Sequence, residues 1–600
     1  MKEIKKKSNT IKISKKLDDG LESKESVGLE MGENWRYILL LVFAVLPFIY
    51  LSINLFKVQI LQYDYYKNIR DKQYTLLPQS IEDRGVIYAE KKNGELVELA
   101  SNKKEYVLVL SPKDIDKKYI EIIFKLVNNV TEIDKSLFIQ KAEKENDSYE
   151  EIKDLTFDEA KKIKDLKING INVKETQKRN YPLSDVGSQV VGFVGDGEGG
   201  IKGRYGLEKY YNDILQKVGQ NKTSFFASLF NDIQNGQIEN DSKKIEDSLS
   251  IVTTIEPNVL KFLNTELKSI YGTWRPDMVA GIIINTKTGE IVAMDSIPNF
   301  DPNNYKDFAA QNFNNPSVQG IYELGSIMKP VTVSGGIENK LITPETIYRD
   351  TGKVEIDGYT IKNHDNRAWG DMNMQGALEN SLNLGMIFIM RKMGFEKFRE
   401  NILNFKFDEE TGIDLPGEVS NKIQSIFGNT EVNFATAAFG QGIATSPISM
   451  LRALNAIANE GKLVNPHLLK KQIDKDDNFL NVIFQDKKSK MAVSEETAKT
   501  VKRMMVLNLD HFAGGKYSDK KYGMGVKTGT GQLAKPGGGY YTDKTLHSYF
   551  AFLPEKNTQF SILIFQVNPK VGQSSSEALT KHIQNIKNFL ISYYNIPPER

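Results

Sequence analysis

The chain of 600 residues contains no cysteine. This absence excludes a disulfide framework, cysteine-based zinc or iron–sulfur sites and a thiol nucleophile, while it leaves the redox compartment open. Histidine is scarce as well, and no two of the five have the HExxH spacing of a zinc hydrolase; they are His364, His467, His511, His547 and His582. We expect neither a metal nor another cofactor.

An excess of charge of one sign is also missing. Lysine and arginine number 79 against 77 aspartate and glutamate residues, which gives a formal net charge of +2. A chain without a basic field is not expected to bind nucleic acid. Hydrophobic residues make up 40% of the chain and aromatic residues 10%, which is enough for substantial cores in more than one domain.

Long uncharged runs are absent except at one place. Residues 37–56, YILLLVFAVLPFIYLSINLF, form a run of 20 residues without a charge, and a helix of that length spans a hydrocarbon core of about 30 Å. The preceding tail, residues 1–36, is rich in lysine, so the positive-inside rule places the N-terminus in the cytoplasm and residues 57–600 outside. A cleaved signal peptide or a buried helix is the alternative. The following Lys57-Val58-Gln59-Ile60 does not resemble a small-residue cleavage site, so we expect an uncleaved anchor.

The rest of the sequence changes character near residue 248. Residues 75–250 mix strand-like runs with charged helical stretches, and the polar stretch 232–247 is the best linker candidate. Beyond it, Ala280–Asn285 and Glu290–Met294 are apolar runs joined by a short turn, a hairpin signal. Further strands are expected at Leu249–Ile255, Gly523–Thr530, His547–Leu553 and Phe560–Val567, and helices at Gln375–Met393, Pro447–Glu460 and Ser576–Tyr593. Hairpins at both ends with helices between them predict an α+β domain around an antiparallel sheet.

Ser326 and Lys329 form a Ser-x-x-Lys pattern. If a helix begins near Gly325, positions i and i+3 share a face, so the lysine amine can reach the serine hydroxyl. Burial and a nearby cation would lower the lysine pKa, and the neutral amine could then take the serine proton. The pattern is weak alone, because it recurs in charged stretches at Ser101–Lys104 and Ser518–Lys521, where we expect solvated surface.

Lys527, Thr528, Gly529 and Thr530 end a strand-like run. A glycine in a strand lets a ligand or another backbone come close, and threonine hydroxyls beside a lysine charge can bond a substrate carboxylate. A second Lys-Thr-Gly, Lys287–Gly289, lies in the expected hairpin turn, where a structural role is expected.

Ser381-Leu382-Asn383 lies between these two motifs in a stretch of helical character. Its serine can relay a proton, and the Asn383 amide can hold an amide group of a substrate. The order Ser-x-x-Lys, Ser-x-Asn, Lys-Thr-Gly is the signature of penicillin-binding proteins and serine β-lactamases.

The chain resembles a class B, monofunctional penicillin-binding protein, which is a peptidoglycan D,D-transpeptidase. Further landmarks of this family occur along nearly everything after residue 36; they are Asp83–Tyr88, Arg179–Pro182, Val191–Gly195, Gly206–Glu208, Thr288–Met294, Pro298–Asn303, Thr411–Glu418 and Phe439–Gly442. No glycosyltransferase-like region of comparable size precedes them, which argues against the bifunctional class A. Leu324, Ile327 and Met328 stand where the family more often has proline, threonine and phenylalanine, which affects pocket detail and not the reacting groups.

This resemblance implies an α+β protein in four parts. Residues 1–36 would be a cytoplasmic tail and residues 37–56 a single transmembrane helix. Residues 57–247 would be an elongated, non-catalytic mixed α/β pedestal of the dimerisation type. Residues 248–600 would be a penicillin-binding transpeptidase domain, in which helices flank a central antiparallel sheet. Such a protein lies in the bacterial cytoplasmic membrane with its catalytic domain outside.

The resemblance also implies a role for each motif residue. Ser326 would attack the penultimate D-Ala carbonyl of a stem pentapeptide with Lys329 as base, and Ser381 and Lys527 would pass the proton to the departing D-Ala. The backbone N–H groups of Ser326 and Thr530 would form the oxyanion hole. Thr528 and Thr530, with Gly529 between them, would bind the terminal carboxylate, and Asn383 would bind the peptide amide.

Substrates and partners follow from the same resemblance. They are peptidoglycan stem peptides on nascent glycan strands, β-lactams as covalent inhibitors, and a polytopic lipid II polymerase with other membrane proteins of the division machinery. The division-type (septal) branch is closer, because the elongation branch commonly has Asp in place of Asn383 and a Trp/Gly-Asp-Thr stretch where Val432–Thr436 stands. Three alternatives stay open: an elongation-type enzyme, a membrane-anchored β-lactamase or β-lactam sensor, and a non-catalytic envelope scaffold. A β-lactamase needs a group that activates water, and the sequence does not assign one.

Overall fold

The computed structural model describes Lys57 and residues 84–600, apart from 145–148, 198–199, 217–247, 475–477, 481–489, 536 and 573. The chain divides into two compact units, Met1–Leu76 and Leu77–Arg600, and the elements below belong to the second. The predicted tail (1–36) and transmembrane helix (37–56) lie outside the described residues. None of the helices in the described part is long and apolar enough to cross a membrane.

A seven-stranded sheet combines strands from both sides of residue 248. Its order is β15-β14-β7-β1-β2-β3, and β4 also pairs with β2. The strands are β1 (Ile87–Glu90), β2 (Leu96–Leu110), β3 (Glu150–Leu155), β4 (Ile171–Asn180), β7 (Ser250–Thr253), β14 (Leu469–Ile473) and β15 (Phe479–Leu480). β1 runs parallel to β7, whereas it is antiparallel to β2. The predicted domain boundary at 248 therefore falls just before a strand that joins the two parts.

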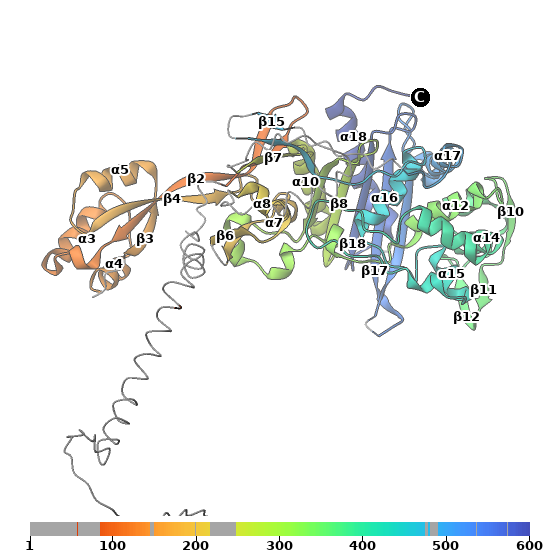
Figure 1. Cartoon of the computed structure of the whole chain (residues 1–600). Coiled ribbons are helices and arrows are strands. Elements are labelled where there is room, and N and C mark those ends of the chain that lie inside the picture. The colour runs from red at the N-terminus through yellow and green to blue at the C-terminus, as the bar shows by residue number, and fades with distance from the viewer. Residues whose placement is uncertain are drawn as a thin grey trace, which may run out of the picture. The chain divides into compact units, whose positions relative to one another are not determined.

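The far half of β2 carries a small lobe with its own core (Figure 1). Three helices pack there: α3 (Ile120–Asn128), α4 (Lys135–Ala142) and α5 (Phe157–Asp165). The core includes Leu108 of β2, Val127 of α3, Phe138 of α4 and Ile163 of α5. Thr156 and Glu159 form a capping box that starts α5, as expected where a threonine precedes a glutamate by three residues.

A buried ion cluster joins this first sheet to the segment that follows it. That segment contains α6 (Ser188–Val191), β5 (Val194–Gly197), β6 (Gly200–Gly203), α7 (Gly206–Tyr210) and α8 (Asn212–Leu215). Glu208 of α7 accepts bonds of 2.7 Å from the Nε atoms of both Arg84 and Arg179. All three side chains are essentially unexposed. Burial alone would raise the pKa of Glu208, but the two guanidinium groups hold it below its usual value.

The predicted antiparallel sheet of the second part is confirmed. It has five strands in the order β16-β17-β18-β8-β9. They are β8 (Met278–Asn285), β9 (Ile291–Ile297), β16 (Gly525–Ala534), β17 (Tyr540–Leu553) and β18 (Phe560–Val567). α10 (Pro257–Trp274) and α18 (Ser575–Tyr594) pack together over one face, and α16 (Pro447–Ala458) packs against the other (Figure 1). Because both faces are covered, nearly every residue of β8, β9 and β18 is buried.

A helical lobe stands beside the β16 edge of this sheet and carries two small two-stranded sheets. Its helices are α12 (Lys329–Glu338), α13 (Met374–Glu379), α14 (Asn383–Asn404), α15 (Glu431–Ala437) and α17 (Glu495–His511). The short α11 (Pro316–Gln319) instead packs against α16 and β8. β10 (Ile347–Asp350) pairs with β13 (Gly370–Asn373), and β11 (Lys353–Ile356) pairs with β12 (Tyr359–Lys362).

The helix predicted over Gln375–Met393 is broken, and this part of the prediction is wrong. α13 ends at Glu379, and α14 begins at Asn383. Between them Ser381 has φ 54°, a left-handed conformation that serine rarely adopts. The N–H of Leu382 bonds back to the carbonyl of Ala377 and closes the turn, which a 3.6-residue apolar periodicity does not reveal.

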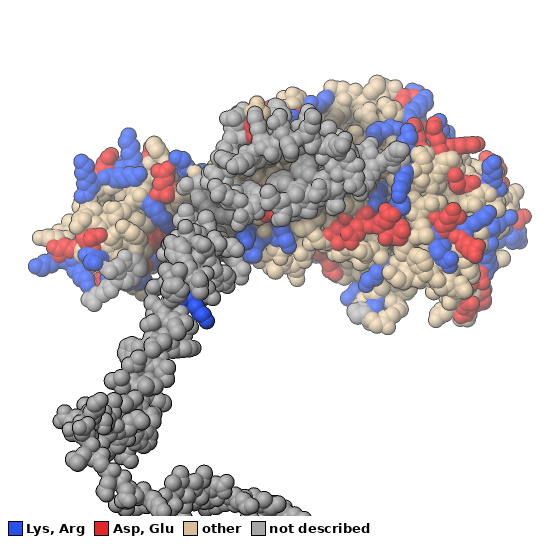
Figure 2. Space-filling model, viewed as in Figure 1, with Lys and Arg blue, Asp and Glu red and all other residues tan. Residues whose placement is uncertain are grey.

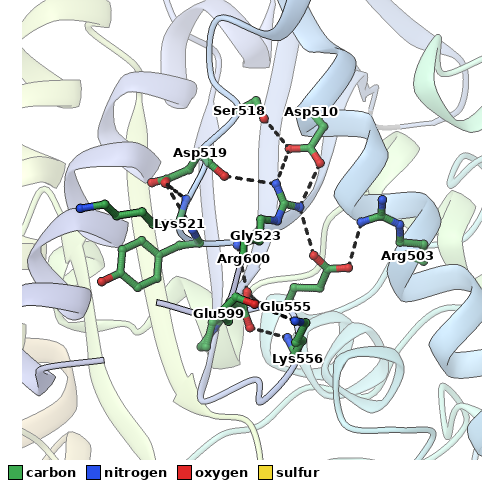
Figure 3. A network of polar contacts seen from close by, with 12 residues as sticks. Arg503, Asp510, Ser518, Asp519, Lys521, Gly523, Glu555, Lys556, Glu599 and Arg600 are labelled. Carbon is green, nitrogen blue, oxygen red and sulfur yellow. Dashed lines mark hydrogen bonds and ion pairs between the residues drawn. The ribbon is translucent and has the colours of Figure 1, made fainter. Parts of the chain in front are cut away.

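Polar contacts bind the end of the chain to the segment that enters β16. The Glu599 carboxylate accepts bonds from the backbone N–H groups of Gly523, Glu555 and Lys556 (Figure 3). The Arg600 guanidinium bonds both oxygens of Asp510, at the end of α17, and also Glu555 (Figure 3). Elsewhere, basic and acidic side chains are interspersed on the face seen in Figure 2, as the near-zero net charge leads one to expect.

Candidate active site

The predicted nucleophile lies on a tight turn that leads into α12. Residues Gly325–Met328 form a 3-10 turn, and α12 begins at Lys329. Pro330 sits in the first turn of α12, where the missing N–H has no helical partner to lose. Gly325 has φ +64°, and a Cβ at Gly440 would lie 2.1 Å from the Gly325 carbonyl oxygen. The Gly440–Gly442 loop therefore packs directly on the backbone that presents Ser326.

Lys329 is fully buried beside the partly exposed Ser326. Its Nζ donates to the Ser381 carbonyl oxygen at 2.5 Å and to Asn383 Oδ1 at 2.8 Å, and it lies 3.2 Å from Ser381 Oγ. Among the described hydrogen bonds, none joins Lys329 to Ser326. Burial lowers the pKa of Lys329 well below its ordinary value, and the charge of Lys527 lowers it further. The lowered pKa favours the neutral amine of Lys329, which is the form that can act as a base.

Ser381, from the second motif, brings the first and third motifs together. Its Oγ lies 3.2 Å from Lys329 Nζ and 3.1 Å from Lys527 Nζ. Lys527 is 3% exposed, and burial lowers its pKa to about 7. A single hydroxyl therefore bridges two buried amines, as a proton relay requires.

Strand β16 comes close to the nucleophile turn because Gly529 has no side chain. A Cβ there would lie 2.4 Å from Ser548 Oγ, 2.5 Å from the Leu324 carbonyl oxygen and 3.1 Å from the Ser326 backbone nitrogen. Ser548, opposite Gly529 on β17, fixes this approach by donating to the Leu324 carbonyl at 2.7 Å. The backbone of β16 and the N–H of Ser326 thus face the same small space.

Thr530 of β16 contacts the first residue of α18. Thr530 Oγ1 lies 3.0 Å from Ser575 Oγ and accepts from the Ser575 N–H at 3.2 Å, at the start of α18. Thr528 and Thr530 are both partly exposed. A carboxylate bound to Thr530 would therefore lie beside Ser575 and the N-terminus of α18, where a negative charge is favoured.

Both the oxygen and the nitrogen of the Asn383 side-chain amide make hydrogen bonds within the protein. Its Oδ1 accepts from Lys329, and its Nδ2 donates to the Lys362 carbonyl at 2.8 Å. One Nδ2 hydrogen is left for a substrate carbonyl. Five other predicted site residues lie around the same space, joined by the contacts given above; they are Ser326, Lys329, Ser381, Lys527 and Gly529.

Four further residues of the site were missed in the sequence. Ser548 and Ser575 hold the backbone and hydroxyl groups just described, and Asn363 and Asp350 hold the start of α14. Only Ser575 had a local signal, because it lies in the serine run 574–576 before a predicted helix; such a run is typical of a helix start, and Ser574 is the N-cap of α18. The described ranges contain no group of three or more side chains suited to hold a metal.

A buried lysine one turn after a partly exposed serine, facing a Lys-Thr-Gly edge strand of an antiparallel sheet, defines the class of serine enzymes that recognise penicillins. The chain belongs to the penicillin-binding protein transpeptidase family. Residues 279–585 match the model described as "Penicillin binding protein transpeptidase domain". Residues 81–228 match "Penicillin-binding Protein dimerisation domain". The predicted class B identity and the predicted serine-type transpeptidase are confirmed.

Known proteins of this kind cover most of the chain. Stage V sporulation protein D of Bacillus subtilis is 28% identical over 539 residues, which is 89% of this chain and 82% of that protein. Peptidoglycan D,D-transpeptidase FtsI of Escherichia coli is 22% identical over 451 residues, 74% of this chain and 72% of that protein.

Solved structures show the same fold. Penicillin Binding Protein 2X from Streptococcus thermophilus has a TM-score of 0.69 at 21% identity, with coverage of 86% of this chain and 80% of that one. Penicillin binding protein 3 from Mycobacterium tuberculosis, complexed with aztreonam, has a TM-score of 0.64 at 21% identity, with coverage of 87% and 98%. The predicted α+β transpeptidase fold is confirmed.

Proposed function

We propose that this protein crosslinks peptidoglycan stem peptides through an acyl-enzyme on Ser326. The observation that carries the proposal is the position of Ser381 Oγ between the buried amines of Lys329 and Lys527, at 3.2 and 3.1 Å. This arrangement offers a base for the attacking serine and a path for its proton. It fits the peptidoglycan D,D-transpeptidases among the relatives.

In the first step Ser326 Oγ attacks the carbonyl carbon of the penultimate D-Ala. A new O–C bond forms, Lys329 takes the hydroxyl proton, and the C–N bond to the terminal D-Ala breaks. The proton passes through Ser381 and Lys527 to the departing amine. In the second step an amine of a neighbouring stem peptide attacks the ester carbonyl: a C–N bond forms, the C–O bond to Ser326 breaks, and the proton lost by the amine returns to Ser326 Oγ, which completes the crosslink.

Binding groups surround this reaction. The backbone N–H groups of Ser326 and Thr530 stabilise the oxyanion. Thr528 and Thr530 bind the terminal carboxylate, and Gly529 allows the donor peptide to lie along β16. Asn383 bonds the peptide amide. β-Lactams imitate the D-Ala-D-Ala end and acylate the same serine.

Labelling with a fluorescent penicillin tests this function. We expect the full chain, in detergent, to form a covalent adduct on Ser326 that survives for hours, and Ser326→Ala to remain unlabelled. Labelled Ser326→Ala protein would refute the nucleophile. An adduct that is lost within seconds would mark a β-lactamase instead, because a hydrolase must release its acyl group quickly.

The membrane location is part of the same proposal. Residues 37–56 would anchor the chain once in the cytoplasmic membrane, with residues 57–600 outside. Because the chain has no native cysteine, each introduced cysteine is the single thiol of its variant that a maleimide can label. In intact cells, a membrane-impermeant maleimide is expected to label Asn93→Cys, which replaces an exposed residue, and to spare Ser8→Cys. The opposite labelling pattern would contradict the topology.

We further propose that the protein acts at the division septum with a polytopic lipid II polymerase and other division membrane proteins. The FtsI relatives and the Asn383 of the second motif support this assignment. A fluorescent fusion is expected at mid-cell; a side-wall pattern would favour elongation instead. The polymerase is expected to co-purify, and to be lost when residues 37–56 are replaced by an unrelated span.

A further inference from the structure

The helix that carries Asn383 begins without a cap of its own. The N-cap residue of α14, Leu382, has no side chain able to accept a bond, and the first N–H groups of a helix have no helical partner. Asn363, just after β12, supplies the acceptor from outside. Its Oδ1 lies 3.0 Å from the Asn383 nitrogen and 3.3 Å from the Leu384 nitrogen.

A buried carboxylate fixes the other end of Asn363. Its Nδ2 donates to both oxygens of Asp350, at 2.9 and 3.0 Å. Asp350 is 1% exposed and Asn363 2%. The amide of Asn363 cannot flip, because Asp350 accepts only and the two helix N–H groups donate only.

Further bonds hold Asp350 from all sides. It accepts from the Tyr348 hydroxyl at 2.8 Å and from the backbone N–H groups of Gly352 and Trp369 at 2.9 and 3.3 Å. The carboxylate is thus fully hydrogen-bonded, as a buried charge must be. It forms a rigid base under Asn363.

The turn held in this way is the one that meets both lysines. Ser381 has the strained φ of 54°, and such strain persists only where the surroundings over-determine it. From this turn its carbonyl and hydroxyl reach Lys329, while Asn383 Oδ1 reaches the same amine. Loss of the outside cap would let the turn and the start of α14 relax together.

We propose that Asn363, oriented by Asp350, is a positioning residue that fixes the Ser381–Asn383 turn against Lys329. It touches no reacting atom. The inference rests on the proposed acylation of Ser326 and adds the group that sets the geometry of its proton path.

Acylation kinetics of the full chain in detergent test it, with the rate resolved into non-covalent affinity for a fluorescent penicillin and the first-order acylation step. For Asn363→Ala we expect the acylation step to slow about 100-fold, the size of effect a misplacement of about 1 Å produces. The non-covalent affinity is expected to change little. The proposal would be overturned if the non-covalent affinity and the acylation rate fell by the same factor, or if neither of them fell.

A paired substitution provides the rescue. Asn363→Asp keeps an acceptor for α14 but sets a second carboxylate against Asp350, so acylation is expected to fall. In Asp350→Asn combined with Asn363→Asp, the new Nδ2 donates to the new carboxylate, and the acylation step is expected to return to within about threefold of the wild type, because the two sites are coupled. If the double variant is acylated no faster than Asn363→Asp alone, the proposed pairing of the two residues is refuted.

Asn373→Ala is the matched control. Asn373 caps the neighbouring helix α13 through Gly376 at 2.8 Å and makes no described bond to Ser381–Asn383. It is expected to retain wild-type acylation. If it slows acylation as much as Asn363→Ala, the effect is a general loosening of the lobe and the proposal fails. A wild-type chain that is not labelled at all would instead refute the proposed function.

Discussion

The Nζ of Lys329 lies 2.5 Å from the carbonyl oxygen of Ser381 and 3.2 Å from the Oγ of the same residue. The carbonyl, like Asn383 Oδ1, can only accept a hydrogen bond. A neutral amine has two hydrogens and one lone pair, so when it donates to these two oxygens its lone pair is left for a hydroxyl. A neutral Lys329 held in this way keeps its lone pair available to accept a hydroxyl proton, and Ser381 Oγ is a hydroxyl within reach.

Removal of the charge at Lys527 should shift the pH dependence of acylation. Burial lowers the pKa of Lys329, and Lys527 lowers it further. Acylation needs the neutral amine, so its rate falls as the pH drops through the pKa of Lys329. In Lys527→Met that pKa rises, and the acid limb of the labelling rate should move to higher pH, with a lower plateau because the relay is broken. The same substitution at exposed Lys521 should not move the limb. An acid limb that stays in place or moves to lower pH would contradict this electrostatic coupling.

Buried Lys527 should also lower the free energy of unfolding, by an amount that depends on pH. Burial lowers the pKa of Lys527 from 10.5 to about 7, so between these pH values the unfolded chain binds more protons than the folded one. Stability of the wild type should rise with pH in this window, by up to about 1.4 kcal/mol per pH unit for one such group. Chemical unfolding should show Lys527→Met to be more stable at pH 7, with the difference shrinking toward pH 10.5. A constant difference would show that Lys527 keeps its charge when folded.

Two glycines of β16 should respond differently to the same substitution. The Cβ of Gly529→Ala would lie 2.4 Å from Ser548 Oγ and 2.5 Å from the Leu324 carbonyl, whereas that of Gly531→Ala would come no closer than 3.4 Å to any neighbour. Overpacking of this kind typically costs about 1–3 kcal/mol. Thermal unfolding and penicillin labelling should both decline in Gly529→Ala and stay near wild type in Gly531→Ala. Similar behaviour of the two variants would refute the close approach of β16 to the Ser326 turn.

The buried cluster around Glu208 should stabilise the fold without taking part in catalysis. Glu208→Ala leaves Arg84 and Arg179 buried without their counter-ion, which should lower the free energy of unfolding by about 3–5 kcal/mol. Loss of the exposed pair Arg349–Asp371 through Asp371→Ala should cost no more than about 1 kcal/mol. Denaturant unfolding measures both. The fraction of Glu208→Ala that stays folded should acylate at the wild-type rate; a slower rate would tie the cluster to the active site.

The residues that could be predicted from the sequence are those that take part directly in the proposed reaction, because the reaction restricts which residue types can stand there. The motifs of Ser326, Lys329, Ser381 and Lys527 are weak one by one, but their order along the chain matches the penicillin-binding signature, and that resemblance indicated one shared site. The five-stranded sheet was predicted because both of its hairpins alternate or run apolar in short segments, and α18 agreed within one residue at each end.

Long-range partners escaped prediction for a physical reason. Asn363 and Asp350 look like ordinary polar residues of a turn-rich stretch, and their burial depends on contacts with α14 that no local pattern encodes. The break at Ser381 was missed because the flanking residues keep a helical apolar period on both sides of the turn. The mixed composition of the seven-stranded sheet was missed because β7 and β14 are short and lie far from β1 in the sequence.

That mixed sheet has a consequence for how the protein is made. β1 has its parallel partner at 250–253, and that partner gains its own next neighbour only at 469–473, so the sheet stays open on one side until most of the chain has been synthesised. Non-local pairing of this sort slows folding, and an unpaired strand edge invites association with other chains. A fragment cut at residue 247 would keep that exposed edge permanently. Chaperones and proteases that meet the nascent chain would therefore find an open edge first at β1 and then at β7, and the β7 edge is covered only when residues near position 470 have been made.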